Sequence, residues 1–302
     1  MREIYGFIKA HQTEFATRIL CSVLDKSRSA FYAWLKGDSH QFNAQKLSVK
    51  VEVKQIFEMH KRRYGSRRIE AELKENGFKA GRHQIRNRMQ EQGLKAIQPR
   101  SFVPKTTQTN PNLLRNSNLL LEMDEVKAID KVWVGDITYL ALADGSWAYL
   151  AVWMDLFSRM IVGWKIATSL DAVLVIDSLK RAILWRDPKP GLVIHSDGGG
   201  QYMDKEFRQL LAGWKFIQSM TRVDNHYDNA FSESLFSRFK AELAQEIPFE
   251  NVQCAHAKTF EYIETYYNRM RRHSSLDYLS PHVFEAKWRQ KQNVKEPKLE
   301  TC

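Results

Sequence analysis

Three acidic side chains occur at positions where their neighbours make a carboxylate unexpected. Asp136 lies within an apolar strand pattern, and two-residue alternation puts it on an otherwise apolar face. A half-buried carboxylate there needs a partner such as an arginine, a helix N-terminus or a metal ion, because an unpaired buried charge is very costly. Asp197 ends a short apolar segment, and residues 198–200 after it are glycine, which lets a ligand approach closely. Glu233 lies on a predicted amphipathic helix, with Lys240 seven positions later on the same polar side.

The three acids belong to two predicted strands and one predicted helix, which could converge on one site. Carboxylate oxygens are hard ligands that suit Mg²⁺ or Mn²⁺. Two such ions, roughly 3.5–4 Å apart, can bind the attacking and leaving oxygens of a phosphodiester. The residues alone leave two interpretations open: a carboxylate metal site, or three unrelated acids in turns and on a solvated helix face.

Other polar residues of this half are better explained by structural roles. Asp155 ends a predicted strand and is followed by Arg159, which favours a local turn or an ion pair. His195 lies on a short buried strand, where a hydrogen-bonded core residue is the more common role. Asp224 and Asp228 belong to the stretch RVDNHYDN, whose Asp and Asn residues suit turns and helix caps.

The elements that must position the three acids follow from hydrophobic periodicity. Three segments rich in Val, Ile, Trp and Tyr are separated by turn signals and predict an antiparallel meander. Helical and strand patterns then alternate, so a mixed α/β sheet of five strands, covered by helices on both faces, is the expected fold. The predicted strands are 132–140, 146–157, 159–167, 192–197 and 215–220; the predicted helices are 169–186, 204–214 and one beginning near residue 229.

The positive charge is concentrated in the first third of the chain. Residues 1–100 hold 21 basic and 10 acidic side chains, whereas residues 101–302 hold 25 of each. Such an asymmetry indicates a polyanionic partner, and nucleic acid is the first to consider. Residues 66–77 and 82–93 predict two short helices joined by a turn, with arginines on the second, which resembles a helix-turn-helix. A small helical bundle with a solvated basic face is the alternative.

Basic residues near the C-terminus, in YYNRMRRHSSL, are interleaved with aromatic ones and suit a phosphate backbone; a solvated helix end is the competing interpretation. The candidate DNA-binding residues are Lys240, Arg67, Arg68, Arg82, Arg86, Arg88, Arg269, Arg271 and Arg272.

The composition of the 302 residues indicates two modules with hydrophobic cores. We predict a basic helical DNA-binding region at 1–95, a proline-containing linker at 96–121, the catalytic core at 122–290 and a polar tail at 291–302. Three widely separated cysteines predict neither a disulfide framework nor a zinc site. The longest apolar run, 147–154, is far shorter than a membrane helix, so we expect a cytoplasmic protein without a membrane role.

Five blocks of the sequence, taken in order, resemble the signature blocks of a known family. They are VWVGDITYL, DLFSRMIVGW, IHSDGGGQY, DNAFSESLFSRFKAE and YNRMRRHSSLDYLSP. The family is the DDE transposases of bacterial insertion sequences, specifically the OrfB-type product of the IS-three group, which carries an integrase core. The 35 residues between Asp197 and Glu233 match the family's interval, and Lys240 occupies its basic position. The N-terminal helical region also looks like that of the family.

The resemblance implies an RNase H-like core in which Asp136, Asp197 and Glu233 bind two Mg²⁺ or Mn²⁺ ions and Lys240 positions the DNA end. It implies double-stranded DNA substrates, namely the terminal inverted repeats and the target, and a circular intermediate. A homo-multimer is expected, because two ends must be held together. An upstream-frame (OrfA-type) product with a leucine zipper is a further implied partner, since no sustained heptad run occurs here. Gly198 departs from the family, many of whose members have arginine there.

Two other functions remain open. A DNA-binding regulator of transposition with inactive carboxylates would bind element ends without strand chemistry. A structure-specific nuclease on the same core would cut branched or hybrid substrates without requiring the ends of the element.

Overall fold

The computed structural model describes residues 2–36, 44–98, 116–123, 125–222, 230–243 and 247–295. Its central feature is a five-stranded sheet in the order β3-β2-β1-β4-β5. The first three strands are antiparallel, and β4 and β5 run parallel to β1. All five predicted strands are confirmed: β1 (Val132–Ala141), β2 (Trp147–Asp155), β3 (Ile161–Ala167), β4 (Val193–Ser196) and β5 (Ile217–Met220).

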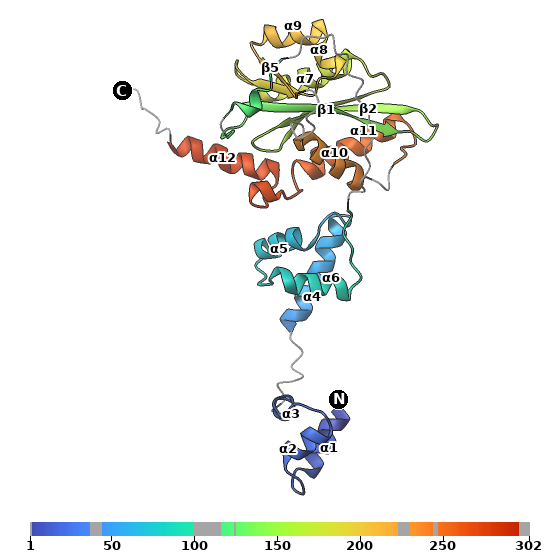
Figure 1. The fold of residues 1–302 in the computed structure, drawn as a ribbon, viewed down its shortest axis with the longest axis vertical. Coiled ribbons are helices and arrows are strands. Elements are labelled where there is room, and N and C mark those ends of the chain that lie inside the picture. The colour runs from blue at the N-terminus through green and yellow to red at the C-terminus, as the bar shows by residue number, and fades with distance from the viewer. Residues whose placement is uncertain are drawn as a thin grey trace.

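Helices cover both faces of this sheet (Figure 1). One face packs against α7 (Ala172–Arg186), α8 (Gly200–Met203) and α9 (Lys205–Gly213). The other packs against α10 (Ala230–Glu242), α11 (Val252–Phe260) and the π-helix η4 (Glu261–Tyr267). Asp171 and Asp204 cap α7 and α9 by accepting bonds from the backbone N–H groups of Leu174 and Glu206. This mixed, doubly covered sheet is the RNase H-like architecture.

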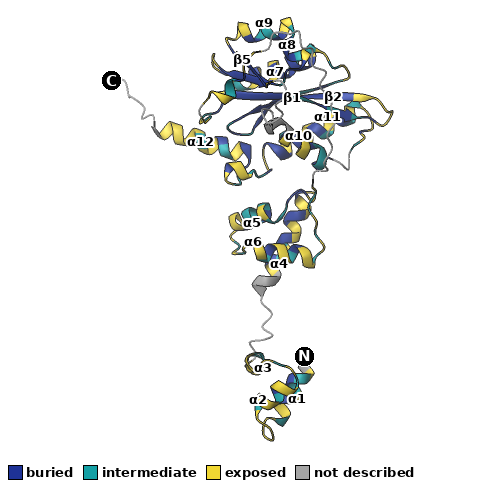
Figure 2. Ribbon diagram, in the orientation of Figure 1, coloured by how far each residue is buried: buried dark blue, intermediate teal, exposed yellow. Residues whose placement is uncertain are grey.

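Two glycines allow close packing on the α7 face of the sheet. Gly135 on β1 lies opposite Trp153 on β2, and a Cβ at this glycine would be 2.2 Å from the indole ring. Gly163 on β3 faces α7, where a Cβ would lie 2.6 Å from the Cβ of Ala182. Trp153 is buried and donates its indole N–H to Ser178 on α7 at 2.9 Å. Most residues of the strands are buried (Figure 2).

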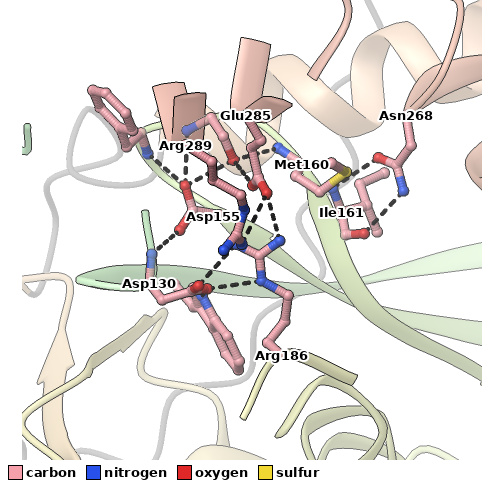
Figure 3. A network of polar contacts seen from close by, with 11 residues as sticks. Asp130, Asp155, Met160, Ile161, Arg186, Asn268, Glu285 and Arg289 are labelled. Atoms are coloured by element: carbon pink, nitrogen blue, oxygen red, sulfur yellow. Dashed lines mark hydrogen bonds and ion pairs between the residues drawn. The ribbon is translucent and has the colours of Figure 1, made fainter. Parts of the chain in front are cut away.

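A buried polar network attaches α12 (Pro281–Lys295) to the sheet and α7 (Figure 3). Arg186, at the end of α7, bonds Asp130 and also Glu285 of α12, the latter at 2.7 Å. Asp155, fully buried at the end of β2, accepts bonds from the backbone N–H groups of Asp130 and Ser158. The prediction of a local turn at Asp155 is therefore confirmed. Burial raises the pKa of Asp155 to about 6, against the lowering effect of these bonds.

The N-terminal third is helical. Helices α1 (Arg2–His11), α2 (Thr17–Val23) and α3 (Arg28–Leu35) share a small core of their own. A second group consists of α4 (Ala44–Met59), α5 (Ser66–Glu75) and α6 (Arg82–Glu91). Helix α5 ends at Glu75 with Asn76 as its C-cap, and Gly77 follows with a φ of +82°. The N-cap of α5 is Gly65, and Ser66 is its first helical residue.

The segments predicted as linker and tail are partly described. Residues 99–115 of the linker lie outside the described residues, and Leu119–Leu121 form a 3₁₀ turn (η2). Helix α12 continues to Lys295, through the first residues of the predicted tail. Within the described chain, no helix is both long and apolar enough to span a membrane.

Candidate functional site

Asp136 and Asp197 lie on adjacent parallel strands at matching positions. In the β1–β4 ladder, Val134 pairs with His195. Two residues further along each strand are Asp136, within β1, and Asp197, directly after β4. Continuation of this register by two residues would align Asp136 with Asp197, and the charges of both carboxylates act on the buried phenol of Tyr202. The structure thus brings together two of the three predicted acids.

Local backbone geometry orients both carboxylates. Oδ1 of Asp136 accepts a bond from the N–H of Ile137 at 2.7 Å, and Oδ1 of Asp197 accepts one from the N–H of Gly199 at 3.0 Å. Both side chains are half-buried. A Cβ at Gly199 would lie 3.0 Å from the Asp197 carboxylate. The glycine run therefore leaves room for this side chain at the end of β4.

Tyr202 lies within the electrostatic reach of both acids. Its phenol is buried, and burial, together with the negative charges of Asp197 and Asp136, raises its pKa well above the ordinary value. The phenol therefore stays neutral at physiological pH. The sequence analysis did not single out Tyr202. Its position in the block IHSDGGGQY, five residues after Asp197, was the only sequence signal that could have placed it near the two acids.

Helix α10 packs beside β1 and carries the predicted basic residue. Burial lowers the pKa of Lys240, and the negative charge of Asp136 partly opposes this, so the two side chains interact electrostatically. The backbone of Glu233 belongs to α10, two helical turns before Lys240. The side chain of Glu233 lies outside the described residues, as do Asp224 and Asp228.

The chemistry of this donor set fits a hard divalent cation. Carboxylate oxygens are the ligands that Mg²⁺ and Mn²⁺ prefer. Among the side chains that the structure describes, no three His, Cys, Asp or Glu residues form a metal site. Asp136 and Asp197 could thus contribute two ligands, and a site with three carboxylates would need one from outside this set.

His195 belongs to the core rather than to this site. Its ring is 1% exposed, and its Nδ1 hydrogen-bonds Oγ of Ser219 on β5 at 2.9 Å. The interpretation of His195 as a hydrogen-bonded core residue is confirmed.

The candidate DNA-binding arginines fall into two groups. Four have exposed side chains: Arg67, Arg82, Arg86 and Arg269. Four others bond within the chain: Arg68, Arg88, Arg271 and Arg272. In this structure these four guanidinium groups bond to other groups of the protein, so contact with a phosphate would require an exchange of partners.

The most buried member of the second group is Arg271. It is 3% exposed and donates three bonds to the Glu242 carboxylate, the shortest of them 2.7 Å long. Sequence reasoning missed this pair, because nothing in a basic run such as NRMRRH indicates a carboxylate partner 29 positions away. We therefore correct the expectation that Arg271 contacts DNA: its role in this structure is to anchor the end of α10.

Comparison with known proteins gives concordant results for both parts of the chain. Residues 127–226 and 215–281 match families described as integrase core domain, and residues 43–102 match the HTH-like domain family. Transposase InsF of insertion sequence IS3A from Escherichia coli (strain K12) is 36% identical over 289 residues, which cover 94% of this chain and 98% of that protein. The transposase of insertion sequence element IS904 from Lactococcus lactis subsp. lactis (strain IL1403) is 38% identical over 233 residues, covering 77% and 91%.

Among solved structures, the intasome of simian T-cell lymphotropic virus in complex with PP2A regulatory subunit B56 gamma aligns with a TM-score of 0.46 and 15% identity. The alignment covers 76% of this chain and 72% of that chain.

Proposed function

Because this chain belongs to the IS3 family of insertion-sequence transposases, whose integrase core makes it a DDE-type polynucleotidyl transferase, we propose that Asp136, Asp197 and Glu233 form its catalytic triad. The observation that carries this proposal is the β1–β4 ladder, whose register aligns Asp136 with Asp197 when it is continued by two residues. The position of Glu233 on α10, the helix beside β1, supports its inclusion. The substrates are the inverted repeats of the element and its target DNA.

The triad residues would hold two Mg²⁺ or Mn²⁺ ions. Such ions would activate the attacking oxygen and neutralise charge on the leaving oxygen of a phosphodiester. Asp136, within β1, and Asp197, directly after β4, would bind these two ions. The N–H of Gly199 orients the Asp197 carboxylate. Tyr202, held neutral by burial, adds no further negative charge to the site. First water and then the freed 3′-OH would attack, giving cleavage and strand transfer.

The exposed arginines are the DNA contacts that we retain. Arg82 and Arg86 lie on α6, the second helix of the helix-turn-helix pair, and Arg67 lies on α5. Arg269 follows the π-helix η4. Lys240 interacts electrostatically with Asp136, and its ammonium would position the phosphate of a DNA end. We further propose that the chain works in the cytoplasm as a homo-multimer that holds two ends, with an upstream-frame product as partner.

The decisive experiment measures Mg²⁺-dependent nicking and strand transfer on labelled duplexes that carry the repeats flanking the gene. Asp197→Asn should bind these ends and abolish cleavage, because it keeps the size of the side chain and removes its charge. Asp187→Asn is the matched control: this exposed residue has a φ of +44° at the end of α7, a conformation that asparagine accepts. Each protein is tested with and without the upstream-frame product.

Each alternative predicts a different result. Retained cleavage by Asp197→Asn would refute the triad. End binding without strand chemistry in every mixture would indicate a regulator. Equal cutting of unrelated duplexes would indicate a nuclease without end specificity.

A further inference from the structure

The helix-turn-helix group α4–α6 contacts the core through polar, ionic and aromatic side chains, and its buried apolar residues belong to the same cluster as those of the sheet. The phenol of Tyr64, just before α5, is fully buried. It donates to the carbonyl of Met270 at 3.1 Å and accepts from the N–H of Arg272 at 2.9 Å. Burial raises the pKa of Tyr64 to about 12, so the phenol keeps its proton and makes both bonds. The Tyr64 side chain of the N-terminal region thus hydrogen-bonds two backbone groups of the core.

Arg272 supplies the charged part of the same contact. Its guanidinium donates to Glu72 at 2.5 Å and also bonds Glu75, and both of these acids are on α5. Its carbonyl accepts from Nε of Arg68 at 2.9 Å, in the first turn of α5. The side chains of Arg272 and Glu72 are 13% and 17% exposed, so solvent screens this pair weakly.

Aromatic and ionic contacts extend the attachment to the π-helix η4. The guanidinium of Arg63 lies 4.4 Å from the centre of the Tyr266 ring, a cation–π contact. Lys61 pairs with Glu261 at 2.8 Å. We call the contacts between residues 60–75 and residues 261–278 the clasp.

The two consecutive arginines Arg271 and Arg272 bond different parts of the molecule. Arg272 bonds α5, whereas Arg271 bonds Glu242 at the end of α10, the helix of Lys240. Helix α6 in turn packs on α5, since Ile85 and Ile69 share one core. A continuous series of contacts therefore connects α6, which carries the exposed arginines, with α10, which carries Lys240 and Glu233.

Covalent connection alone would not fix this geometry. Side-chain contacts between the two regions are therefore needed to hold α5 against residues 270–272. We propose that Arg272 is a positioning residue that holds the helix-turn-helix group on the core. It thereby sets the number of base pairs between the sequence bound by α6 and the phosphodiester that is cut. This inference rests on the proposed function, and it differs from the prediction that Arg272 binds phosphate.

Arg272→Ala is the test, with Lys287→Ala as control. Lys287 is exposed on α12, outside the clasp, and its replacement removes the same charge. Hydrogen exchange of peptides from 60–75 and 268–278 reports docking without requiring activity. In Arg272→Ala we expect these peptides to exchange at least tenfold faster than in the wild type, equivalent to about 1.4 kcal/mol. In the Lys287→Ala control we expect the exchange rate to be unchanged. End binding should stay within about twofold, because the exposed arginines of α6 are untouched, while cuts spread over several neighbouring phosphates.

A charge swap distinguishes positioning from a general loss of structure. Arg272→Glu alone should show the same defects more strongly, since it puts a third acid beside Glu72 and Glu75. Combining it with Glu72→Arg restores an opposite pair and should recover much of the exchange protection and the single cut position.

Three results would overturn the proposal. Unchanged exchange in Arg272→Ala would show that docking does not depend on this residue. Faster exchange with a single sharp cut would show that docking does not set the cut position. Weaker end binding, a smaller salt dependence and a sharp cut would make Arg272 a phosphate ligand. If the wild type itself fails to cut, the proposed function has failed, and the exchange data alone then decide whether Arg272 docks the two regions.

Discussion

Arg271→Met removes one partner of a buried ion pair, and we expect it to cost the core about 3–5 kcal/mol of unfolding free energy. The side chains of Arg271 and Glu242 are each 4% exposed. Arg271 provides three of the bonds to this carboxylate, and the Tyr262 hydroxyl provides another at 2.9 Å. Methionine fills much of the arginine volume, so the expected loss arises from charge rather than from a cavity.

The pH dependence of this loss follows from the pKa of Glu242. Burial alone would raise it, but the Arg271 charge and hydrogen bonds hold it below the ordinary value of 4.5. In the wild type, the pair's contribution is present above pH 4.5 and is lost as the pH falls through the lowered pKa. Without Arg271, burial dominates and the pKa rises above 4.5, so stability is instead lost as the pH rises through it. The deficit of the variant should therefore be larger at pH 8 than at pH 5.

Urea unfolding followed by tryptophan fluorescence measures this deficit, because Trp133, Trp153 and Trp164 are buried in the core. Arg269→Met, at an exposed position two residues away, should change stability by less than about 0.5 kcal/mol. Adding Glu242→Gln to Arg271→Met removes the unpaired charge and should recover most of the loss. An equal deficit at pH 5 and pH 8, or no recovery in the double variant, would refute this reasoning.

Three further predictions concern packing, titration and DNA binding. Gly163→Ala should destabilise the core by about 1–3 kcal/mol in urea, because the added Cβ would lie 2.6 Å from that of Ala182; a change below about 0.5 kcal/mol would show that α7 moves away freely. The pKa of Asp155, raised by burial from 3.8 to about 6, should reduce stability by about 3 kcal/mol as the pH rises across that window, and Asp155→Asn should abolish this slope; parallel pH profiles would contradict it. Arg86→Ala should reduce the magnitude of the salt slope of end binding by about 0.9, whereas Arg88→Ala, which loses an arginine paired with Glu91, should change it less; equal effects would show that Arg88 leaves its partner on DNA.

Local patterns were sufficient for the sheet but not for the partners of charged residues. The alternation and turn signals around β1–β3 are properties of short windows, so the strands and the unusual position of Asp136 could be found from the sequence. The pairing of β4 with β1 depends on a crossover through α7, and it is the register of this pairing, continued by two residues, that aligns Asp197 with Asp136. The π-helix η4 was not predicted, since its hydrogen-bonding pattern depends on how its buried side chains pack against the rest of the core.

The arginine run shows the same limit in another way. Arg269, Arg271 and Arg272 look equivalent in sequence, yet one is exposed, one pairs with α10 and one pairs with α5. A charged side chain on a helix end has no local signal for its partner, because the partner is selected by tertiary contacts. The family resemblance predicted the triad and left this division of roles undetermined.

The distribution of charge gives a reason for attaching the two regions to each other. Residues 101–302 are neutral in sum, and their candidate site concentrates carboxylates that repel a DNA backbone. The excess of positive charge lies in residues 1–100, which include the exposed Arg82 and Arg86 of α6. Under the proposed function, a duplex held there would be brought to an acidic site that repels it, and divalent cations at that site would complete the neutralisation. The clasp therefore couples attraction and chemistry: a loosened clasp should make cleavage more sensitive to Mg²⁺ concentration as well as less accurate in position. An Mg²⁺ titration of cleavage by Arg272→Ala tests this, and an unchanged midpoint would show that the core recruits DNA without help from the N-terminal charge.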